Sequence, residues 1–466
     1  MSAQAEGSDN MASQCITAIQ GLLGDRLSTN PEICLRHGRD ESFHTPVAPD
    51  AVAFARSTQE VSEIVKICAA HKTPVIPFGT GTSLEGHVAA LRGGISIDVS
   101  GMNQIIRVNA EDMDCTVQPG VTRNQLNTYL HDTGLFFPID PGADASLGGM
   151  TATRASGTNA VRYGTMRENV IALTVVLADG RIVQTSQRSR KSAAGYDLTR
   201  LFVGSEGTLG VITEVTLRLY GIPEAKSAAV CSFETMEGAV NAVIETLQTG
   251  LPMSRIELVD ELSITAINAY SNLDYPEAPT LFLEFTGTPG SIKEQIAQFR
   301  EIAQGHDTRG FQWAEKTEDI NALWKARHDA YYAIMALRPG CKGFATDVCV
   351  PISRLAECIL ETRKDIEASS LLAPIVGHVG DGNFHVSFVI DPDQPDELAE
   401  ANRINDKMVA RAIAMEGTCT GEHGIGYGKI RFLEDELPSA VPVMKMVKRA
   451  LDPDNIMNPG KVLSMN

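Results

Sequence analysis

The sequence predicts an α+β protein with at least two domains. Its 466 residues exceed what one hydrophobic core ordinarily holds, and 43% hydrophobic with 21% charged residues is typical of a globular chain. Up to about residue 223, short apolar runs alternate with glycine-rich loops, whereas from residue 228 two β-α-β units follow one another. Two such units side by side predict a ferredoxin-like domain with an antiparallel sheet.

The elements of the first part follow from hydrophobic periodicity. Residues 11–45 are expected to form helix and loop. Thr58 is a candidate N-cap for a helix that runs to about Ala70, because apolar residues recur there on one face. Short apolar runs between turn residues predict strands at 74–77, 95–99, 115–118, 173–177 and 211–219.

In the second part the same criteria predict strands at 228–233, 254–259, 280–285 and 311–314, with helices at 236–249 and 291–304. A long helix is expected at 318–337. Strands at 344–350 and 374–378, a helix at 403–415 and a helical tail from residue 433 complete the chain.

Charge and cysteine usage exclude several classes of protein. The net charge of −18 argues against a nucleic-acid partner, whose phosphates require a basic surface. The nine cysteines are scattered without a C-x-x-C pair, which suits buried free thiols in a reducing compartment. No apolar run is long enough to cross a bilayer. The first eleven residues carry no recognisable targeting signal, so the chain is either cytosolic or lacks a segment that was removed.

The segment 377–385 (Gly-His-Val-Gly-Asp-Gly-Asn-Phe-His) predicts a β-hairpin. Asp381-Gly382 is a strong signal for a two-residue type I′ turn. That turn would set His378 opposite His385, with Cβ atoms roughly 5 Å apart on one face. Two imidazoles at this separation could share a metal ion, and Glu422 on another glycine-rich loop offers a carboxylate. The alternative is an ordinary hairpin with two polar residues on its wet face.

Three glycine-rich loops lie within the first part, at 77–86, 141–164 and 204–213. Such loops let backbone N–H groups approach phosphates closely. The first has neither the G-x-G-x-x-G spacing of a Rossmann unit nor a Walker signature, and one loop alone is better explained by turn formation. Together, the three loops could wrap a long, doubly phosphorylated ligand.

These loops resemble the FAD-binding domain of the vanillyl-alcohol oxidase (PCMH) type. The hairpin, Gly421-Glu422-His423-Gly424 and Asn458-Pro459-Gly460-Lys461 resemble the FAD-linked D-2-hydroxyacid dehydrogenases of that superfamily, including the cytochrome-type D-lactate dehydrogenases. The resemblance implies a two-part FAD-binding domain, a ferredoxin-like substrate domain and a C-terminal helical segment that returns to the flavin. The implied boundaries are 1–45 for an N-terminal helical segment, 46–223 for the FAD domain, 224–415 for the substrate domain and 416–466 for the C-terminal segment.

The resemblance also implies the cofactor contacts. The first loop would bind the FAD pyrophosphate, the second would line the flavin, the third would hold the adenosine half and the ribityl chain, and Asn458 would return to the flavin ring. The implied residues are Pro77, Gly79, Thr80, Gly81, Thr82, Ser83, Gly86, Pro141, Gly142, Ser146, Gly149, Ser156, Gly157, Asn159, Glu206, Gly207, Gly210, Ile212 and Asn458. FAD is expected to be non-covalent, with His87 as the weaker covalent alternative.

Oxidation of a 2-hydroxy acid needs a base that takes the hydroxyl proton and a Lewis acid, such as a metal ion, that stabilises the alkoxide. It also needs a cation that binds the substrate carboxylate. The resemblance assigns the metal to His378, His385 and Glu422, and this donor set suits zinc, manganese or iron. His423 is the expected base, with orientation of the metal ligand as the alternative. Arg327 is expected to bind the substrate carboxylate, against the alternative of a solvated helix arginine. Asn383 is a further candidate donor to substrate.

One departure concerns the substrate. D-2-hydroxyglutarate dehydrogenases carry a lysine two residues before the aspartate that corresponds to Asp347, and here that position is Ala345. Because a small apolar residue cannot offset a second buried carboxylate, the sequence favours a monocarboxylate such as D-lactate.

The prediction is therefore an FAD- and metal-dependent D-lactate dehydrogenase that passes electrons to a protein such as cytochrome c and resides in mitochondria. D-2-hydroxyglutarate dehydrogenase and the glycolate dehydrogenase flavoprotein subunit are the alternatives within the class. A metal hydrolase and a non-catalytic flavin-binding module are the alternatives outside it.

Overall fold

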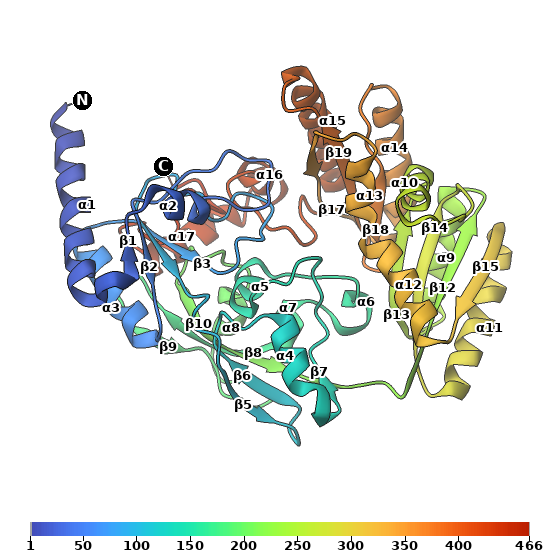
Figure 1. Ribbon diagram of the computed structural model, residues 1–466, viewed down its shortest axis with the longest axis horizontal. Helices are drawn as coiled ribbons and strands as arrows, with labels where there is room; N and C mark the ends of the chain where they lie inside the picture. Colours follow the sequence, from blue (N-terminus) through green and yellow to red (C-terminus); the bar gives the residue numbers. More distant parts are fainter. Residues whose placement is uncertain (1, 466) are drawn as a thin grey trace. The chain divides into compact units, whose positions relative to one another are not determined.

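The computed structural model describes residues 2–465, with side chains from residue 12 onward, and it divides into two compact units (Figure 1). The prediction that the first eleven residues carry no targeting signal therefore concerns residues whose side chains are not described. Unit 1 comprises residues 1–156, 165–221 and 422–466, and unit 2 comprises residues 157–164 and 222–421. The chain thus crosses between the units more than once.

Unit 1 contains a four-stranded sheet and a five-stranded sheet. The first has the order β1 (Leu27–Ser28), β2 (Ala51–Phe54), β4 (Ile95–Asp98), β3 (Val75–Phe78), and β3 and β4 pair in parallel with each other, as do β2 and β4. The second is antiparallel, in the order β5 (Ile105–Asn109), β6 (Asp114–Val117), β10 (Val211–Arg218), β8 (Val170–Val176), β9 (Ile182–Gln184). A small pair joins β7 (Leu135–Phe136) to β11 (Tyr220–Gly221).

The helices of unit 1 are α1 (Ser2–Leu23), α2 (Pro31–His37), α3 (Thr58–Ala70), α4 (Arg123–Leu130), α5 (Leu147–Thr153), α7 (Met166–Asn169), α8 (Leu198–Phe202), α16 (Ile430–Glu436) and α17 (Val441–Leu451). The N-cap of α3 is Ser57 rather than the expected Thr58, because the Ser57 hydroxyl accepts the Glu60 N–H. Buried residues of α1 and α3 pack with the four-stranded sheet in one core, which includes Ile19, Ile64 and Ile97.

Unit 2 contains the predicted ferredoxin-like arrangement. Its first four strands lie in the order β15 (Thr308–Ala314), β12 (Ala225–Phe233), β14 (Thr280–Gly287), β13 (Met253–Val259), and all their pairings are antiparallel. The helices α9 (Met236–Gln248) and α11 (Pro289–Gly305) follow β12 and β14 in the chain, as the β-α-β pattern requires.

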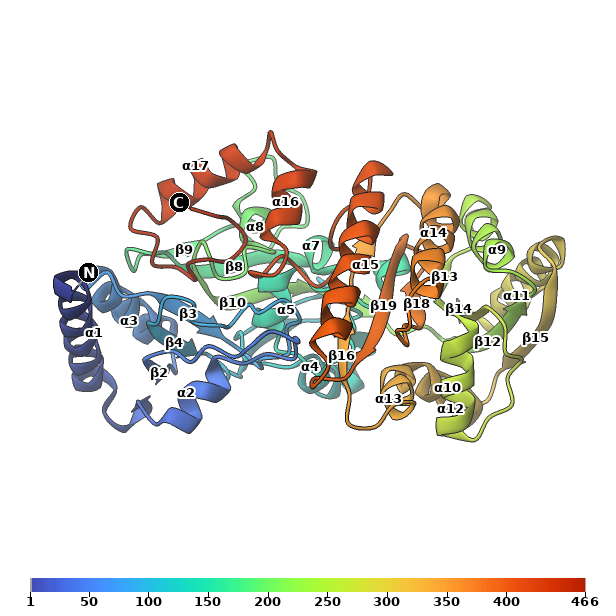
Figure 2. The ribbon, with the colours of Figure 1, turned by 90° about the horizontal axis from the view of Figure 1, so that it is seen from above.

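The same sheet continues past β13 through β18 (Ile375–His378), β19 (Asn383–Ile390) and β16 (Lys342–Ala345), and β17 (Val348–Cys349) also pairs with β19. Helices α9 and α14 (Leu355–Glu367) lie on one side of this sheet, and α10 (Glu261–Ser271), α12 (Thr317–His328) and α13 (Ala330–Ala336) lie on the other (Figure 2). The short α6 (Ala160–Tyr163) and the long α15 (Pro395–Ala414) complete the unit.

Three predicted elements of unit 2 differ from the structure. The expected helix at 318–337 is two helices, because α12 ends at His328 and α13 begins at Ala330 after Asp329. The expected strand at 344–350 is divided into β16 and β17, with Thr346 and Asp347 between them. The helix expected at 403–415 starts eight residues earlier, at Pro395, where proline suits a first helical turn.

The C-terminal segment adds a short parallel pairing to β3. Val75 donates its N–H to the Ile456 carbonyl over 2.8 Å, and Asn458 donates its N–H to the Val75 carbonyl over 2.8 Å. Asp452, which is 1% exposed, accepts the N–H groups of Ile456 and Met457 and the ammonium of Lys448. Burial lowers the pKa of Lys448 and the Asp452 carboxylate opposes that shift.

Replacing Asp452 with Ala is expected to destabilise the protein by about 3–5 kcal/mol, because the buried Lys448 ammonium loses its counter-ion. The midpoint of urea unfolding measures the loss. The matched control is Asp454→Ala, which removes an exposed ion pair with Lys72 and should cost at most about 1 kcal/mol. Equal shifts for the two variants would contradict the assignment.

Candidate active site

The β18–β19 hairpin has a different register from the one expected. His378 lies opposite Asn383 and Val376 opposite His385, so the connection is a four-residue loop, Val379 to Gly382. Gly382 has positive φ (80°), whereas a type I′ turn requires positive φ at Asp381 as well. Instead, the Asp381 N–H bonds to the His378 carbonyl over 3.0 Å. The predicted turn type and the predicted direct opposition of the histidines are therefore wrong.

The two histidines nevertheless meet, because the register differs by two residues and side chains alternate with period two. Such a shift keeps His378 and His385 on the same face as diagonal neighbours. Their ring centroids are 5.5 Å apart with an interplanar angle of 81°, and their ligand nitrogens lie within 4.8 Å of each other. The hairpin thus presents the pair that the metal hypothesis requires.

Each imidazole is oriented through its Nδ1 atom. In His378, Nδ1 lies 2.7 Å from Oε1 of Glu257, a residue of β13. In His385, Nδ1 lies 2.8 Å from the Thr346 carbonyl oxygen. A carbonyl or carboxylate at Nδ1 selects the tautomer in which Nε2 is the ligating atom, as is common in metal sites.

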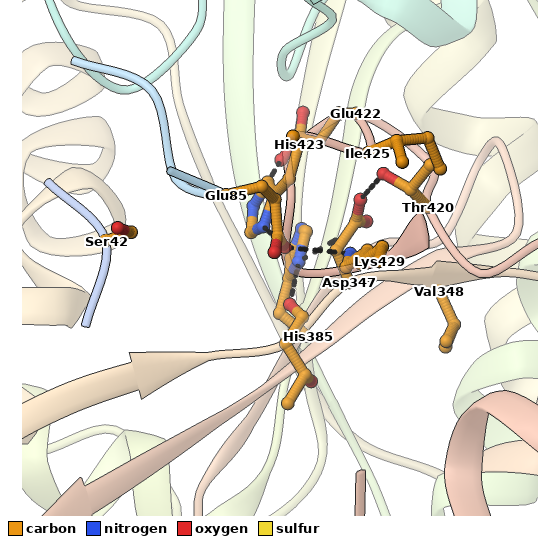
Figure 3. Close-up of polar contacts among 12 residues, drawn as sticks. Ser42, Glu85, Asp347, Val348, His385, Thr420, Glu422, His423, Ile425 and Lys429 are labelled. Carbon is orange, nitrogen blue, oxygen red and sulfur yellow. Dashed lines mark hydrogen bonds and ion pairs between the residues drawn. The ribbon is translucent and has the colours of Figure 1, made fainter. Parts of the chain in front are cut away.

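The interruption between β16 and β17 places Asp347 beside the hairpin. Asp347 is fully buried and accepts a hydrogen bond from the Asn383 amide over 2.7 Å. It accepts a second from the Thr420 hydroxyl over 2.6 Å (Figure 3). Asn383 donates a second bond, of 2.7 Å, to the Val348 carbonyl. Both amide hydrogens of Asn383 are therefore engaged within the protein, and in this conformation Asn383 fixes the hairpin tip rather than presenting a donor to substrate.

The predicted third metal ligand, Glu422, directly follows the last residue of unit 2. Thr418 bonds with Cys349 of β17, and Thr420 bonds with Asp347. Gly421 packs so closely that a β-carbon there would lie 2.3 Å from the Asn383 amide nitrogen. Glu422 is joined to this anchored segment by a peptide bond, which sets its Cα about 3.8 Å from that of Gly421.

Arg327, on α12, is buried and not solvated. Its side chain is 11% exposed, and its Nη2 lies 2.7 Å from Oε2 of Glu257, which is 1% exposed. Its Nε has no hydrogen-bond partner among the described residues. The solvated alternative is thus wrong for Arg327, whereas the side chain of Lys325 on the same helix is exposed.

The predicted base His423 lies in unit 1 beside a buried carboxylate that sequence reasoning did not single out. Its Nδ1 is 3.9 Å from Oε1 of Glu85, and its Nε2 is 3.9 Å from Oε1 of Glu422. Lys429 pairs with the same Glu85 oxygen over 3.0 Å (Figure 3). Glu85 lies within the first glycine-rich loop, next to Gly86. That position is the sequence feature from which Glu85 could have been identified as a site residue.

The structure brings the three predicted cofactor loops together within unit 1. The Ser146 N–H bonds to the Thr80 hydroxyl over 3.4 Å, and a β-carbon on Gly79 would lie 2.5 Å from the Ser146 oxygen. In the third loop, Gly207 (φ 73°) packs against Pro77, with 2.9 Å from a built β-carbon to the proline ring. The buried Ser146 hydroxyl has no hydrogen-bond partner among the described residues, as expected for a group that faces a bound ligand.

Two of the predicted cofactor residues also tie unit 1 together. The Glu206 carboxylate accepts N–H groups of Ile425 and Gly426 over 2.7 and 2.8 Å and pairs with His87 over 3.2 Å. The Asn458 amide donates to the carbonyls of His87 and Glu206. Their side chains thus clamp the C-terminal segment onto the first and third loops.

The electrostatics of the Glu206–His87 pair follow from burial and proximity. Burial raises the pKa of Glu206, but His87 and the two N–H groups outweigh it and leave the pKa below its ordinary value. Burial lowers the pKa of His87, but Glu206, Asp40 and Glu85 outweigh it and raise the pKa. The proximity of the two groups therefore favours the charged form of each.

Sequence analysis also missed Asp40, which fastens the N-terminal segment to the first loop. Its Oδ2 accepts the Ser83 hydroxyl and the His87 N–H, each over 3.0 Å. The sequence predicts only helix and loop for residues 11–45. No local pattern links Asp40 to a residue more than forty positions away.

The last predicted flavin residues divide between the units. Gly157 and Asn159 belong to unit 2, because Asn159 accepts from Arg255 over 3.0 Å and Arg162 donates to the Pro252 carbonyl over 2.7 Å. The other predicted residues of this set lie in unit 1: Thr82, Gly81, Gly86, Pro141, Gly142, Gly149, Ser156, Gly210 and Ile212.

No described helix is long and apolar enough to cross a membrane.

Known proteins share this fold. The structure superposes on p-cresol methylhydroxylase with a TM-score of 0.81 over 97% of both chains, at 18% identity, which concerns the fold alone. That likeness confirms the predicted PCMH-type α+β fold.

Sequence comparisons define the family. The family described as FAD linked oxidases, C-terminal domain, matches residues 222–462, and an FAD binding domain matches residues 49–186. The chain is 54% identical to a probable mitochondrial D-lactate dehydrogenase of Danio rerio, over 97% of this chain and 92% of that one. It is 49% identical to mitochondrial D-lactate dehydrogenase [cytochrome] of Arabidopsis thaliana, over 97% and 80%. Both relatives are named as mitochondrial, which confirms the predicted localisation. The chain belongs to the FAD-linked oxidases, among the flavin-dependent dehydrogenases that include the D-lactate dehydrogenases.

Proposed function

We propose that this chain oxidises D-2-hydroxy acids, foremost D-lactate, to 2-oxo acids with the help of a divalent metal ion and non-covalent FAD. The observation that supports a metal ion is the His378–His385 pair. Both Nδ1 atoms have hydrogen-bond partners, and the two ligand nitrogens lie within 4.8 Å of each other. Glu422 adds an oxygen donor, and three protein ligands leave positions for substrate. Two imidazoles and a carboxylate suit zinc or manganese.

The reaction removes a proton from the hydroxyl and a hydride from C2. When bound, the metal supplies Lewis acidity that lowers the pKa of the substrate hydroxyl, and FAD supplies the hydride acceptor at N5. His423 takes the hydroxyl proton on its imidazole. Arg327 binds the substrate carboxylate through its guanidinium, which fits a carboxylate in two-point fashion.

The family supports a protein electron acceptor for the reduced flavin. The Arabidopsis relative is named as a cytochrome-type enzyme. The net charge of −18 favours a basic acceptor such as cytochrome c, since opposite charges steer encounter. The ion pair that holds His87 supports FAD bound without a covalent link to this residue.

The test of this function is anaerobic bleaching of the flavin. D-lactate is expected to bleach the flavin absorbance, and L-lactate is not. Removal of the metal by a chelator should abolish bleaching while the flavin stays bound, and added zinc or manganese should restore it. A colourless protein would support the hydrolase alternative, and bleaching by L-lactate alone would refute the stereochemical assignment.

Substituting a ligand tests the metal site directly. His378→Ala, His385→Ala and Glu422→Ala should each lose bound metal and nearly all D-lactate turnover but retain FAD, since the glycine-rich loops are unchanged. Metal content by mass spectrometry and flavin absorbance give the two readings. The control is His306→Ala, which removes a histidine of unit 2 that pairs with Glu245 and should change neither. Full activity in His385→Ala would remove the metal from the mechanism.

The substrate class rests on Ala345. This residue lies opposite Ser387 on β19, two positions from His385, so its side chain is on the sheet face of the histidines. The variant Ala345→Lys should raise the ratio of kcat/KM for D-2-hydroxyglutarate to that for D-lactate by about 10- to 100-fold, because a charge-assisted hydrogen bond contributes roughly 1.5–3 kcal/mol. The control is Ala345→Met, which adds length without charge. A wild-type enzyme that prefers the dicarboxylate would overturn the argument.

A further inference from the structure

We propose that Glu257 is a positioning residue that holds the metal ligand His378, by a hydrogen bond, and the substrate-binding Arg327, by an ion pair, in one buried network. This inference rests on the function proposed above. Glu257 stands on β13 and is 1% exposed. Its two carboxylate oxygens are divided between two cationic or proton-donating groups: Oε1 at 2.7 Å from His378 Nδ1 and Oε2 at 2.7 Å from Arg327 Nη2.

The sheet explains why one side chain reaches both partners. β13 pairs with β18 so that Leu258 lies opposite Gly377 and Val259 opposite Val376. Continuing that register sets Glu257 opposite His378, on the same face of the sheet. Arg327 approaches this face from α12, on the side where α12 packs against the sheet. The carboxylate therefore lies between a strand residue and a helix residue that are 51 positions apart.

Burial makes the carboxylate costly unless it is paired. A charge removed from water needs opposite charge and hydrogen bonds around it, and loss of one partner leaves the others uncompensated. For His378, the carboxylate fixes the ring and selects Nε2 as the ligand atom, which raises its donor strength. For Arg327, it fixes one edge of the guanidinium, while the buried Nε has no hydrogen-bond partner among the described residues.

Glu257 fixes the distance between the metal ligand and the substrate-binding cation, which neither His378 nor Arg327 fixes alone. A 2-hydroxy acid must present its hydroxyl to the metal and its carboxylate to a cation at a defined separation. Because both groups are tied to the two oxygens of one carboxylate, their separation is set by a rigid, planar group. Glu257 touches no reacting atom and acts through His378 and Arg327.

The chain offers a matched control in Glu284 of β14. Glu284 is also buried, at 8% exposure, and lies opposite Arg255 with 3.8 Å between their charged groups. It stands in the same sheet and has an arginine partner but no histidine. A general cost of neutralising a buried carboxylate in this sheet therefore appears in Glu284→Gln as well.

The experiment compares Glu257→Gln with Glu284→Gln in the purified, FAD-loaded protein. A glutamine keeps the shape but turns an NH₂ group toward one of two donors. Apo protein prepared with a chelator is titrated with Zn²⁺ or Mn²⁺, and the KM for D-lactate and flavin content are measured. Glu257→Gln should weaken metal binding about 10- to 100-fold and raise the KM, with flavin content unchanged. Glu284→Gln should retain wild-type metal affinity.

A second variant keeps the test decisive if Glu257→Gln does not fold. Glu257→Asp retains the charge but is one methylene shorter, so it reaches only one partner, and it should weaken metal binding or raise the KM. Wild-type metal affinity and KM in either variant overturn the positioning role, provided that His378→Ala loses the metal. If His378→Ala retains the metal, the proposed metal site itself fails and the two outcomes are separated.

Discussion

The pairing of β19 with its neighbours is the constraint on which the candidate metal site depends. β19 pairs with β18, β16 and β17, and β18 in turn joins the ferredoxin-like sheet through β13. His385 lies on β19 itself, His378 lies on the neighbouring β18, and Asp347 lies between β16 and β17, which both pair with β19. Because backbone hydrogen bonds within a sheet are satisfied on both sides, side chains on β19 have little freedom to move apart. The hairpin is therefore a rigid carrier for His385 and, through β18, for His378.

In each unit, buried carboxylates fix the positions of the residues around them by accepting hydrogen bonds and forming ion pairs. In unit 2, Glu257 and Asp347 are almost fully excluded from water, and each accepts hydrogen bonds from more than one chain segment. In unit 1, Glu206, Asp40 and Asp452 have the same character. A buried charge tolerates few alternative arrangements of its neighbours, so these groups restrict the geometry of the residues around them as well as stabilising it.

Unit 1 depends on contacts between segments that are distant in sequence. Loops near residues 80, 146 and 206 meet one another, and the N- and C-terminal segments are fastened to them by Asp40, Asn458 and Lys461. Burial lowers the pKa of Lys461 to about 8, even though Glu206 and Asp40 raise it. The terminal segments thus support the glycine-rich loops rather than forming separate attachments.

The sequence by itself determined many of the strands and helices, the ferredoxin-like pattern and the residue types of the candidate site, because these depend on local periodicity and on motifs. It also placed His378 and His385 on one face of the sheet, because a two-residue error in register leaves each side chain on the same face. Only the tertiary structure decided the true hairpin register, the division of the 318–337 helix, and the roles of Glu257, Glu85 and Asp40. Those roles arise from contacts between residues far apart in the chain, and no local spacing encodes which buried carboxylate will face which cation.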